Sequence, residues 1–449
     1  MIKKLFIFFW VFVFSSSLHA GVLFHPLKPV VRDLTNGIEL FIAEDHEFPT
    51  VQLILSIKGG SVYDPQGQEG LAALAMETIR TGGTTSRSPK QVEEVLESVG
   101  ASLEMGTTPE YHFASLSLLK KDLDLGLDLL FDLLHQPALD PGKFALAKKK
   151  MEEGIKRIEE EPMALVQREF PPLVYGEESA WGRRPTLSSL QKIQWKDVKS
   201  FHQNFVVPYR FVVATAGDFT EEEIFSKIQK LTQPYGKMER VSLPEIPSVQ
   251  PSFDKGLKII SKKGLTQSTI VLGHLGAKRD NPDKFPLLVM NFILGGSGAL
   301  TSRMGDEIRT TAGKAYAVGS DFGFGKDFGL FKAIAQTALG NTDWVIHKMT
   351  DMIREMQKNP KFTNAEIDRA KKSILRSFFF SYETRFSQVK DLARFRLIGY
   401  PDDYLEIFQK QIASVKRADL ERVARKYLHP DGLKVLVFTD DEKVGEMNP

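Results

Sequence analysis

The chain has 449 residues, enough for two to four domains with sizeable cores. Its 59 Lys and Arg residues nearly balance 57 Asp and Glu residues, and the net charge of +2 argues against an electrostatic nucleic-acid binder. No cysteine is present, which excludes disulfides, thiolate zinc sites, iron–sulfur clusters and cysteine nucleophiles. We therefore expect a globular protein that does not bind nucleic acid.

The first twenty residues have the three parts of a secretory signal peptide. Lys3 and Lys4 precede an apolar run over 5–14, and a serine-rich stretch ending at Ala20 follows it. The alternative is a membrane anchor, but this run falls short of the ~20 residues that a spanning helix needs. We expect cleavage after Ala20 and a mature protein that is exported to the periplasm without a membrane span.

The chain contains an internal duplication. Residues 193–218 and 415–440 align without gaps at an offset of 222 residues, and each copy has the pattern of a helix, a proline turn and a strand ending at Asp. The matched pairs are Asp197 with Asp419, Phe205 with Tyr427, Pro208 with Pro430, and Val213 with Val435. The two halves are therefore homologous.

A proline-rich stretch separates the halves. Residues 233–255 contain four prolines, which break helices and suit an extended linker. We expect an N-terminal domain over 21–232 and a C-terminal domain over 256–449. Both are of the α+β class, with strands over 37–43, 51–57, 113–119, 211–216, 270–275 and 433–438, a helix over 142–158, and another helix capped by Thr363 and Glu366.

Several short motifs follow one another in a characteristic order. They are Gly59-Gly60-Ser61-Val62-Tyr63, Gly70-Leu71-Ala72, Gly82-Gly83-Thr84, Thr108-Pro109-Glu110-Tyr111, Trp181-Gly182-Arg183, Ser302-Arg303-Met304, Glu307-Ile308-Arg309 and Ala315-Tyr316. Their order and spacing resemble the insulinase/pitrilysin family of zinc peptidases, in the small-subunit branch of the mitochondrial processing peptidase. The resemblance implies two homologous domains, each an antiparallel-rich sheet flanked by helices, arranged as half of a clam shell.

Active members of that family carry H-x-x-E-H on the first helix, where two His bind zinc and the Glu activates water. The same frame here has Ala73 and Glu77 at the His positions and Met76 at the Glu position. The family's third zinc ligand is a Glu on a later helix, a few residues before an acidic residue that is followed by proline. Counting back from Glu161-Pro162 places Gly154 at that position. The resemblance thus implies that these four positions are degenerate and that this chain binds no metal or other cofactor itself.

A substitute metal site has little support in the sequence. No two of the nine His residues stand four apart in a zinc motif. Glu77 and Glu153 remain as two carboxylates that could share a cation, and an active peptidase with an unconventional metal site stays an alternative. The helical pattern places Gly154 on the inward stripe of its helix with Met151 and Ile158.

Arg309 and Tyr316 match an Arg/Tyr pair that, in the family, orients the substrate and stabilises the oxyanion across the chamber from zinc. The alternative is a surface Arg and a core Tyr. The resemblance implies a non-catalytic, substrate-binding subunit of an exported heterodimeric zinc metalloendopeptidase that acts on unfolded peptides. Zinc is then expected in a homologous H-x-x-E-H partner chain. A stand-alone peptide-binding or scaffold protein without a role in proteolysis is the rival hypothesis.

Three further motifs have simpler interpretations. The loop Gly295-Gly296-Ser297-Gly298 lacks the Gly-Lys-Ser/Thr of a phosphate loop and matches a family loop. The triplets Asp321-Phe322-Gly323 and Asp327-Phe328-Gly329 lack the other kinase motifs, so we expect strand or turn residues there. Residues 378–380, all phenylalanine, are expected to pack in the core with some exposure.

Overall fold

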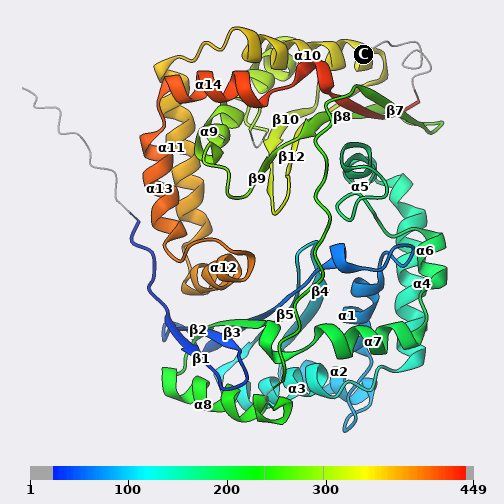
Figure 1. The fold of residues 1–449 in the computed structure, drawn as a ribbon, viewed down its shortest axis with the longest axis vertical. Coiled ribbons are helices and arrows are strands. Elements are labelled where there is room, and N and C mark those ends of the chain that lie inside the picture. The colour runs from blue at the N-terminus through cyan, green and yellow to red at the C-terminus, as the bar shows by residue number, and fades with distance from the viewer. Residues whose placement is uncertain (1–23, 237, 297, 441–449) are drawn as a thin grey trace, which may run out of the picture.

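The computed structural model describes residues 24–236, 238–296 and 298–440. Two α+β halves lie one above the other, and each is built on its own mixed sheet (Figure 1). The expected signal peptide over 1–20 lies outside the described residues. Within them, no helix has both the length and the apolar character required to cross a membrane.

The N-terminal half contains a six-stranded sheet in the order β1-β2-β6-β3-β5-β4. All neighbours are antiparallel except β2 and β6. The strands are β1 (Val30–Asp33), β2 (Glu39–Glu44), β3 (Thr50–Lys58), β4 (Ser102–Thr107), β5 (Tyr111–Leu119) and β6 (Phe211–Gly217). The helices are α1 (Leu71–Thr81), α2 (Pro89–Ser98), α3 (Leu123–His135), α4 (Pro141–Arg157), α5 (Pro162–Tyr175), α6 (Leu187–Lys192), α7 (Trp195–Phe205) and α8 (Glu221–Thr232).

The C-terminal half repeats this plan with a five-stranded sheet in the order β10-β12-β8-β13-β7, in which only β13 and β7 are parallel. The strands of this sheet are β7 (Gly256–Ser261), β8 (Gln267–Leu275), β10 (Ala317–Phe322), β12 (Leu330–Ala338) and β13 (Lys434–Thr439). Two short strands, β9 (Ala277–Lys278) and β11 (Phe324–Gly325), form a separate pair. The helices are α9 (Lys284–Leu294), α10 (Thr342–Lys358), α11 (Asn364–Ser381), α12 (Arg385–Ile398), α13 (Tyr404–Ser414) and α14 (Arg417–Tyr427).

Local sequence explains these elements. In β5, alternate residues from His112 to Leu118 are buried, as expected for a strand with one face against the core. At the start of α11, Thr363 Oγ1 accepts a hydrogen bond from Glu366 N at 3.2 Å, and the Glu366 carboxylate accepts one from Thr363 N at 2.8 Å. The expected strands, the capping box and the antiparallel-rich α+β class are confirmed.

Each sheet packs its own helices on one face and a helix from the other half on the opposite face. Helix α5 contacts β8 and β13 of the C-terminal sheet, where Leu165, Val166 and Phe170 share a buried cluster with Leu436 and Phe438. Helix α12 contacts β2, β3 and β6 of the N-terminal sheet in the same way. Helices α5 and α12 occupy equivalent places in the duplication. Each half therefore contributes the same helix to the sheet of the other half, and these two contacts join the halves.

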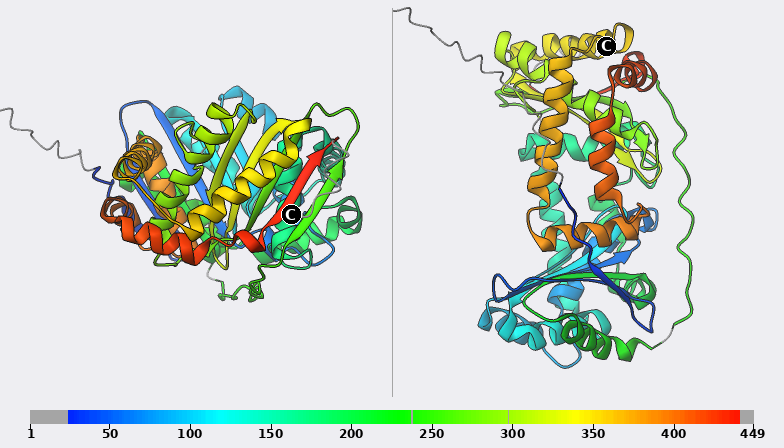
Figure 2. Two further views of the ribbon diagram at one scale, coloured as in Figure 1. Left: turned by 90° about the horizontal axis from the view of Figure 1, so that it is seen from above. Right: turned by 90° about the vertical axis from the view of Figure 1, so that its left-hand side faces the viewer.

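The connection between the halves is extended. Residues 238–255 contain no helix or strand and run along one side of the molecule from the lower half to the upper half (Figure 2). The Asp327 carboxylate fixes this segment by accepting hydrogen bonds from Ser248 Oγ at 3.0 Å and from Val249 N at 2.5 Å. The linker is therefore anchored to the C-terminal half before β7 begins.

Candidate functional site

Helix α1 carries Ala73, Met76 and Glu77, which the resemblance aligns with the zinc motif, and its start is held in place by a buried carboxylate. Asp64, which is buried, accepts hydrogen bonds from Gly70 N at 2.8 Å and Ala72 N at 2.9 Å at the start of the helix. Burial raises the pKa of this carboxyl to about 6, although both backbone donors oppose the shift. The start of α1 is thus fixed by the Asp64 carboxyl group.

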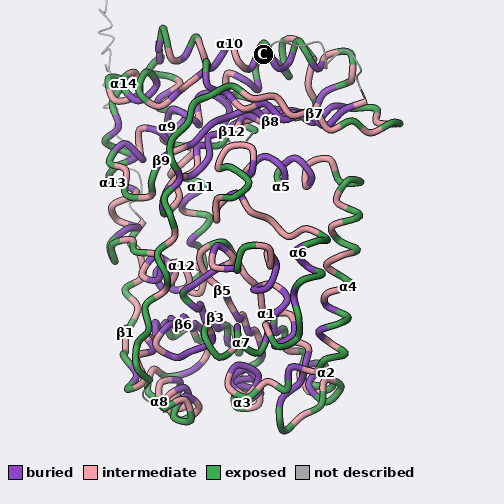
Figure 3. Tube along the Cα trace, turned by 45° about the vertical axis from the view of Figure 1, so that its right-hand side comes forward, coloured by how far each residue is buried: buried purple, intermediate pink, exposed green. Residues whose placement is uncertain are grey.

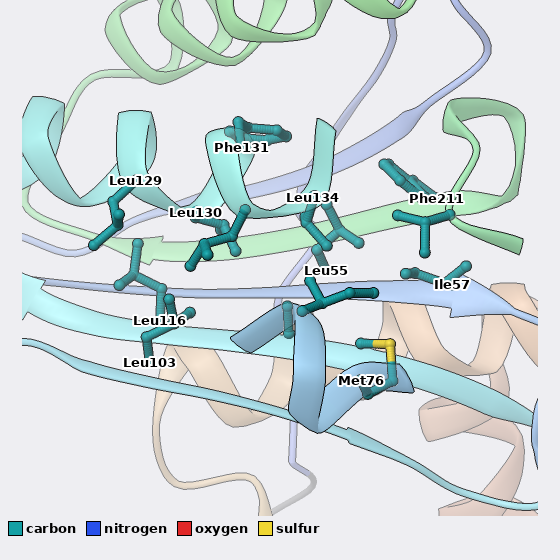
Figure 4. Packing of buried hydrophobic residues seen from close by; sticks show 14 of the residues in the cluster. Leu55, Ile57, Met76, Leu103, Leu116, Leu129, Leu130, Phe131, Leu134 and Phe211 are labelled. Atoms are coloured by element: carbon teal, nitrogen blue, oxygen red, sulfur yellow. The ribbon is translucent and has the colours of Figure 1, made fainter. Parts of the chain in front are cut away.

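Two of the three aligned side chains on α1 are apolar, and the third is a carboxylate. Met76 is 0% exposed and points into the core beside Leu55 and Ile57 of β3 (Figure 4). Ala73 and Glu77 are half-buried, and the Glu77 carboxylate has no hydrogen bond or ion pair within the described part of the chain. The position that the resemblance aligns with the water-activating Glu therefore holds a thioether inside the packed core.

The predicted inward position of Gly154 is wrong. Gly154 and Glu153 are exposed on α4, and a Cβ atom added to Gly154 would meet no atom within 4 Å. The buried residues of α4 are Phe144 and Ala147 in its first half, while Met151 is only half-buried. Figure 3 shows this contrast between buried α1 and the largely uncovered end of α4. Along its last turns the stripe is half-buried through Met151, Ile155 and Ile158, while Gly154 itself is exposed.

Zinc does not fit these residues. The four aligned positions supply one carboxylate, from Glu77, whereas zinc sites take four ligands rich in His, Cys, Asp or Glu. In the described ranges, no three His, Asp or Glu side chains come close enough to hold a metal ion. The residues at these positions therefore support no step on a metal held by this chain.

Arg309 and Tyr316 lie in a different setting. Arg309 is exposed on a short π-helix (Gly305–Thr311), and Tyr316 is 63% exposed just before β10. Neither the guanidinium nor the phenol has a hydrogen-bonding partner in the part of the chain that the structure describes. The backbone around them is ordered, since Tyr316 N donates to Gln336 O at 2.9 Å. Both side chains are free to contact another molecule.

Other motif residues hold loops together. Ser61 N donates to Thr108 O at 2.9 Å, and a Cβ atom on Gly60 would come within 2.4 Å of the Pro109 backbone, so only glycine fits there. Arg183 of the Trp181-Gly182-Arg183 motif forms an ion pair with Glu69 at 3.5 Å. The sequence did not indicate that these separate motifs meet, because each contact joins residues distant along the chain.

A buried charge cluster, also missed from sequence, ties α5 to the other half. Glu169 accepts hydrogen bonds from Arg184 at 2.9 and 2.8 Å, from Arg168 at 2.8 Å and from Lys258 of β7 at 2.9 Å. Burial opposes ionisation of Glu169, but the hydrogen bonds from Arg184 and Lys258 outweigh it and hold the pKa of the carboxyl below its usual range. No motif or periodicity marks this cluster.

Family models match both halves of the chain. Residues 40–179 match the insulinase (peptidase family M16) model, and residues 192–374 match the model of the peptidase M16 inactive domain. An "uncharacterized zinc protease YmxG" of Bacillus subtilis is 22% identical over 418 residues, which cover 92% of this chain and 97% of the relative. The "non-peptidase homolog YmxG" of Helicobacter pylori is 24% identical over 416 residues, with 90% and 93% covered.

Solved structures show the same fold. A peptidase M16 inactive domain from Pseudomonas fluorescens superposes with a TM-score of 0.82 at 22% identity, covering 92% of this chain and 98% of that one. A protease from Helicobacter pylori gives 0.83 at 18% identity, with 92% and 100% covered. With no H-x-x-E-H in its sequence, this chain belongs to the insulinase family, peptidase family M16, as a member without the zinc-binding motif of the active enzymes.

Proposed function

We propose that this chain is the non-catalytic, substrate-binding subunit of an exported heterodimeric zinc metallopeptidase that acts on unfolded peptides. The observation that carries the proposal is the contrast between the two candidate sites. The four aligned positions hold two apolar side chains, one half-buried carboxylate and one exposed glycine, whereas Arg309 and Tyr316 remain exposed and unpaired within the described residues. Such side chains are suited to act on a site that another chain completes.

The chemistry of the pair supports this role. A guanidinium and a phenol both donate hydrogen bonds toward negative charge, as stabilisation of a tetrahedral oxyanion requires. A matching relative, mitochondrial-processing peptidase subunit beta of Blastocladiella emersonii, is 26% identical over 290 residues, which cover 63% of this chain and 60% of that protein. Its name describes one subunit of a larger peptidase, which agrees with the proposed division of labour.

The partner would be a homologous H-x-x-E-H chain that holds the zinc, while this chain holds no cofactor. The signal-peptide pattern over 1–20 favours assembly in the periplasm. The rival function is a scaffold with no role in proteolysis. The exposed Arg/Tyr pair favours the peptidase subunit, because a scaffold has no need of two unpaired donors.

Substitution of the pair in the assembled complex tests the proposal. Arg309→Ala and Tyr316→Phe should each lower peptide turnover about 100- to 1000-fold, as loss of one oxyanion donor does elsewhere, while assembly and the zinc content of the partner stay unchanged. Arg417→Ala, on an exposed part of α14, is the control. Wild-type turnover by the double variant at a normal melting temperature would favour the scaffold.

A further inference from the structure

A cleft between the two halves collects the sequence motifs that the proposed function leaves unused. Its N-terminal wall contains the first motif around Val62, the turn around Glu110, and Trp181. Its C-terminal wall contains residues 321–330, the segment with the two Asp-Phe-Gly triplets. Loops from both homologous halves therefore build one site.

The cleft is large enough for an elongated ligand. It consists of two cavities of about 470 and 230 Å³ that share Val62, Glu110 and Trp181 and therefore adjoin one another. Ligand sites in proteins commonly enclose 300–1,000 Å³. Apolar side chains, among them Leu397 and Phe328, line these cavities. A ligand that spans both would contact apolar groups along its length.

The charge of the cleft is unbalanced. Lys58 from the end of β3, Lys326 from the loop after β11, and Lys332 of β12 line it, and within the described ranges their ammonium groups have no ion pair or hydrogen bond. Asp321 is the unpaired carboxylate among the lining residues. Three free cations therefore face one free anion, and the cleft favours a negatively charged ligand.

The other charged groups of the cleft are neutralised internally. Arg279 forms an ion pair with Glu110, and Arg396 forms ion pairs with Glu39 at 3.2 Å and Asp402 at 2.7 Å. These pairs leave the three lysines as the source of the positive excess.

Two buried polar atoms of cleft-lining residues also lack a hydrogen bond in the described structure, Nε1 of Trp181 and Nε of Arg183, and only the first belongs to a neutral side chain. The indole Nε1 of Trp181 is buried and has no hydrogen bond in the described structure. A buried donor without a partner is unfavourable, and a ligand carbonyl or carboxylate would satisfy it. The cleft thus offers a neutral donor in addition to its three cations.

We propose that the cleft binds an acidic, partly apolar peptide segment in an extended form. Its carboxylates would pair with Lys58, Lys326 and Lys332, and an oxygen acceptor would occupy the Trp181 donor. Because the lysines come from three separate segments, a chain with several carboxylates fits better than an amphiphile with one head group. This inference deepens the proposed peptide-binding role by naming acidic peptides, and it concerns the chain without its partner.

Fluorescence anisotropy with the isolated full-length chain tests the proposal. The probe is a fluorescein-labelled octapeptide of alternating leucine and glutamate, compared with the same peptide carrying glutamine or lysine in place of glutamate. We expect the acidic peptide to bind tightest and to weaken as sodium chloride rises, because salt screens the lysines. Equal binding of all three peptides, or binding of laurate but of no peptide, would overturn the proposal.

Charge-matched variants locate the binding. Replacing Lys58, Lys326 and Lys332 together by glutamine should weaken the acidic peptide about tenfold, since each ion pair contributes modestly. The control replaces three exposed helical lysines outside the cleft, Lys149, Lys196 and Lys410, and has the same net charge. Equal affinities of the two triple variants would refute the site.

A native reporter gives an independent measurement that does not depend on the lysine variants. With Trp10, Trp195 and Trp344 replaced by phenylalanine, Trp181 is the remaining tryptophan of the four in the sequence. The acidic peptide should change its emission in a saturable way, with the affinity found by anisotropy. Binding without any change at Trp181 would place the peptide elsewhere. Loss of proteolytic activity in the heterodimer plays no part in this test, so failure of one proposal is distinguishable from failure of the other.

Discussion

Replacement of Glu169 by glutamine should destabilise the junction between the halves. The Glu169 side chain is 8% exposed and faces Arg168, Arg184 and Lys258, whose side chains are 19%, 22% and 34% exposed. Removing one partner of a fully buried ion pair costs about 3–5 kcal/mol. Because solvent reaches all three cations, we expect the lower end, about 3 kcal/mol, or a fall in melting temperature of roughly 3 °C for a chain of this length.

The assay is thermal and urea unfolding of Glu169→Gln beside Glu153→Gln, which changes an exposed glutamate of α4. The folded-state pKa of Glu169 lies below its unfolded value near 4.5, so its contribution to stability is present above pH 4.5 and is lost as pH falls through the folded pKa. The difference between Glu169→Gln and wild type should therefore shrink on acidification. Melting temperatures of the two variants within 1 °C of each other at pH 7 would refute the reasoning.

Three further predictions concern the metal helix and export. Met76→Glu places a carboxylate in the core and should cost about 3–5 kcal/mol in urea unfolding, whereas the volume-conserving Met76→Leu should cost less than about 1.5 kcal/mol. Asp64→Ala removes the acceptor of two buried backbone donors and should lower the free energy of unfolding by about 2–4 kcal/mol. Asp64→Asn should partly restore that stability. Equal stability of the alanine variant and wild type would contradict the anchoring role of Asp64. Intact mass spectrometry of protein from its native envelope should give a chain beginning at Gly21, and a full-length cytosolic chain would disprove export.

The amino-acid sequence by itself determined the local elements and the loss of zinc ligands. Alternating apolar residues predicted strands such as β5, and Thr363 with Glu366 predicted the start of α11, because periodicity and capping act between residues close in the chain. The frame around Ala73 and Met76 was sufficient to show that the H-x-x-E-H ligands are missing, since ligand identity is a property of residue type.

Only the tertiary structure decided which surfaces those elements cover. The apolar stripe of α5 does not specify that Phe170 packs on the sheet of the other half, and the stripe of α4 does not reveal that Gly154 is exposed. Likewise, Lys58 and Lys326 are ordinary lysines in sequence and become neighbours of one cleft only when the halves close together. The physical reason is that burial and charge pairing depend on contacts between residues far apart in the chain, which local periodicity does not encode.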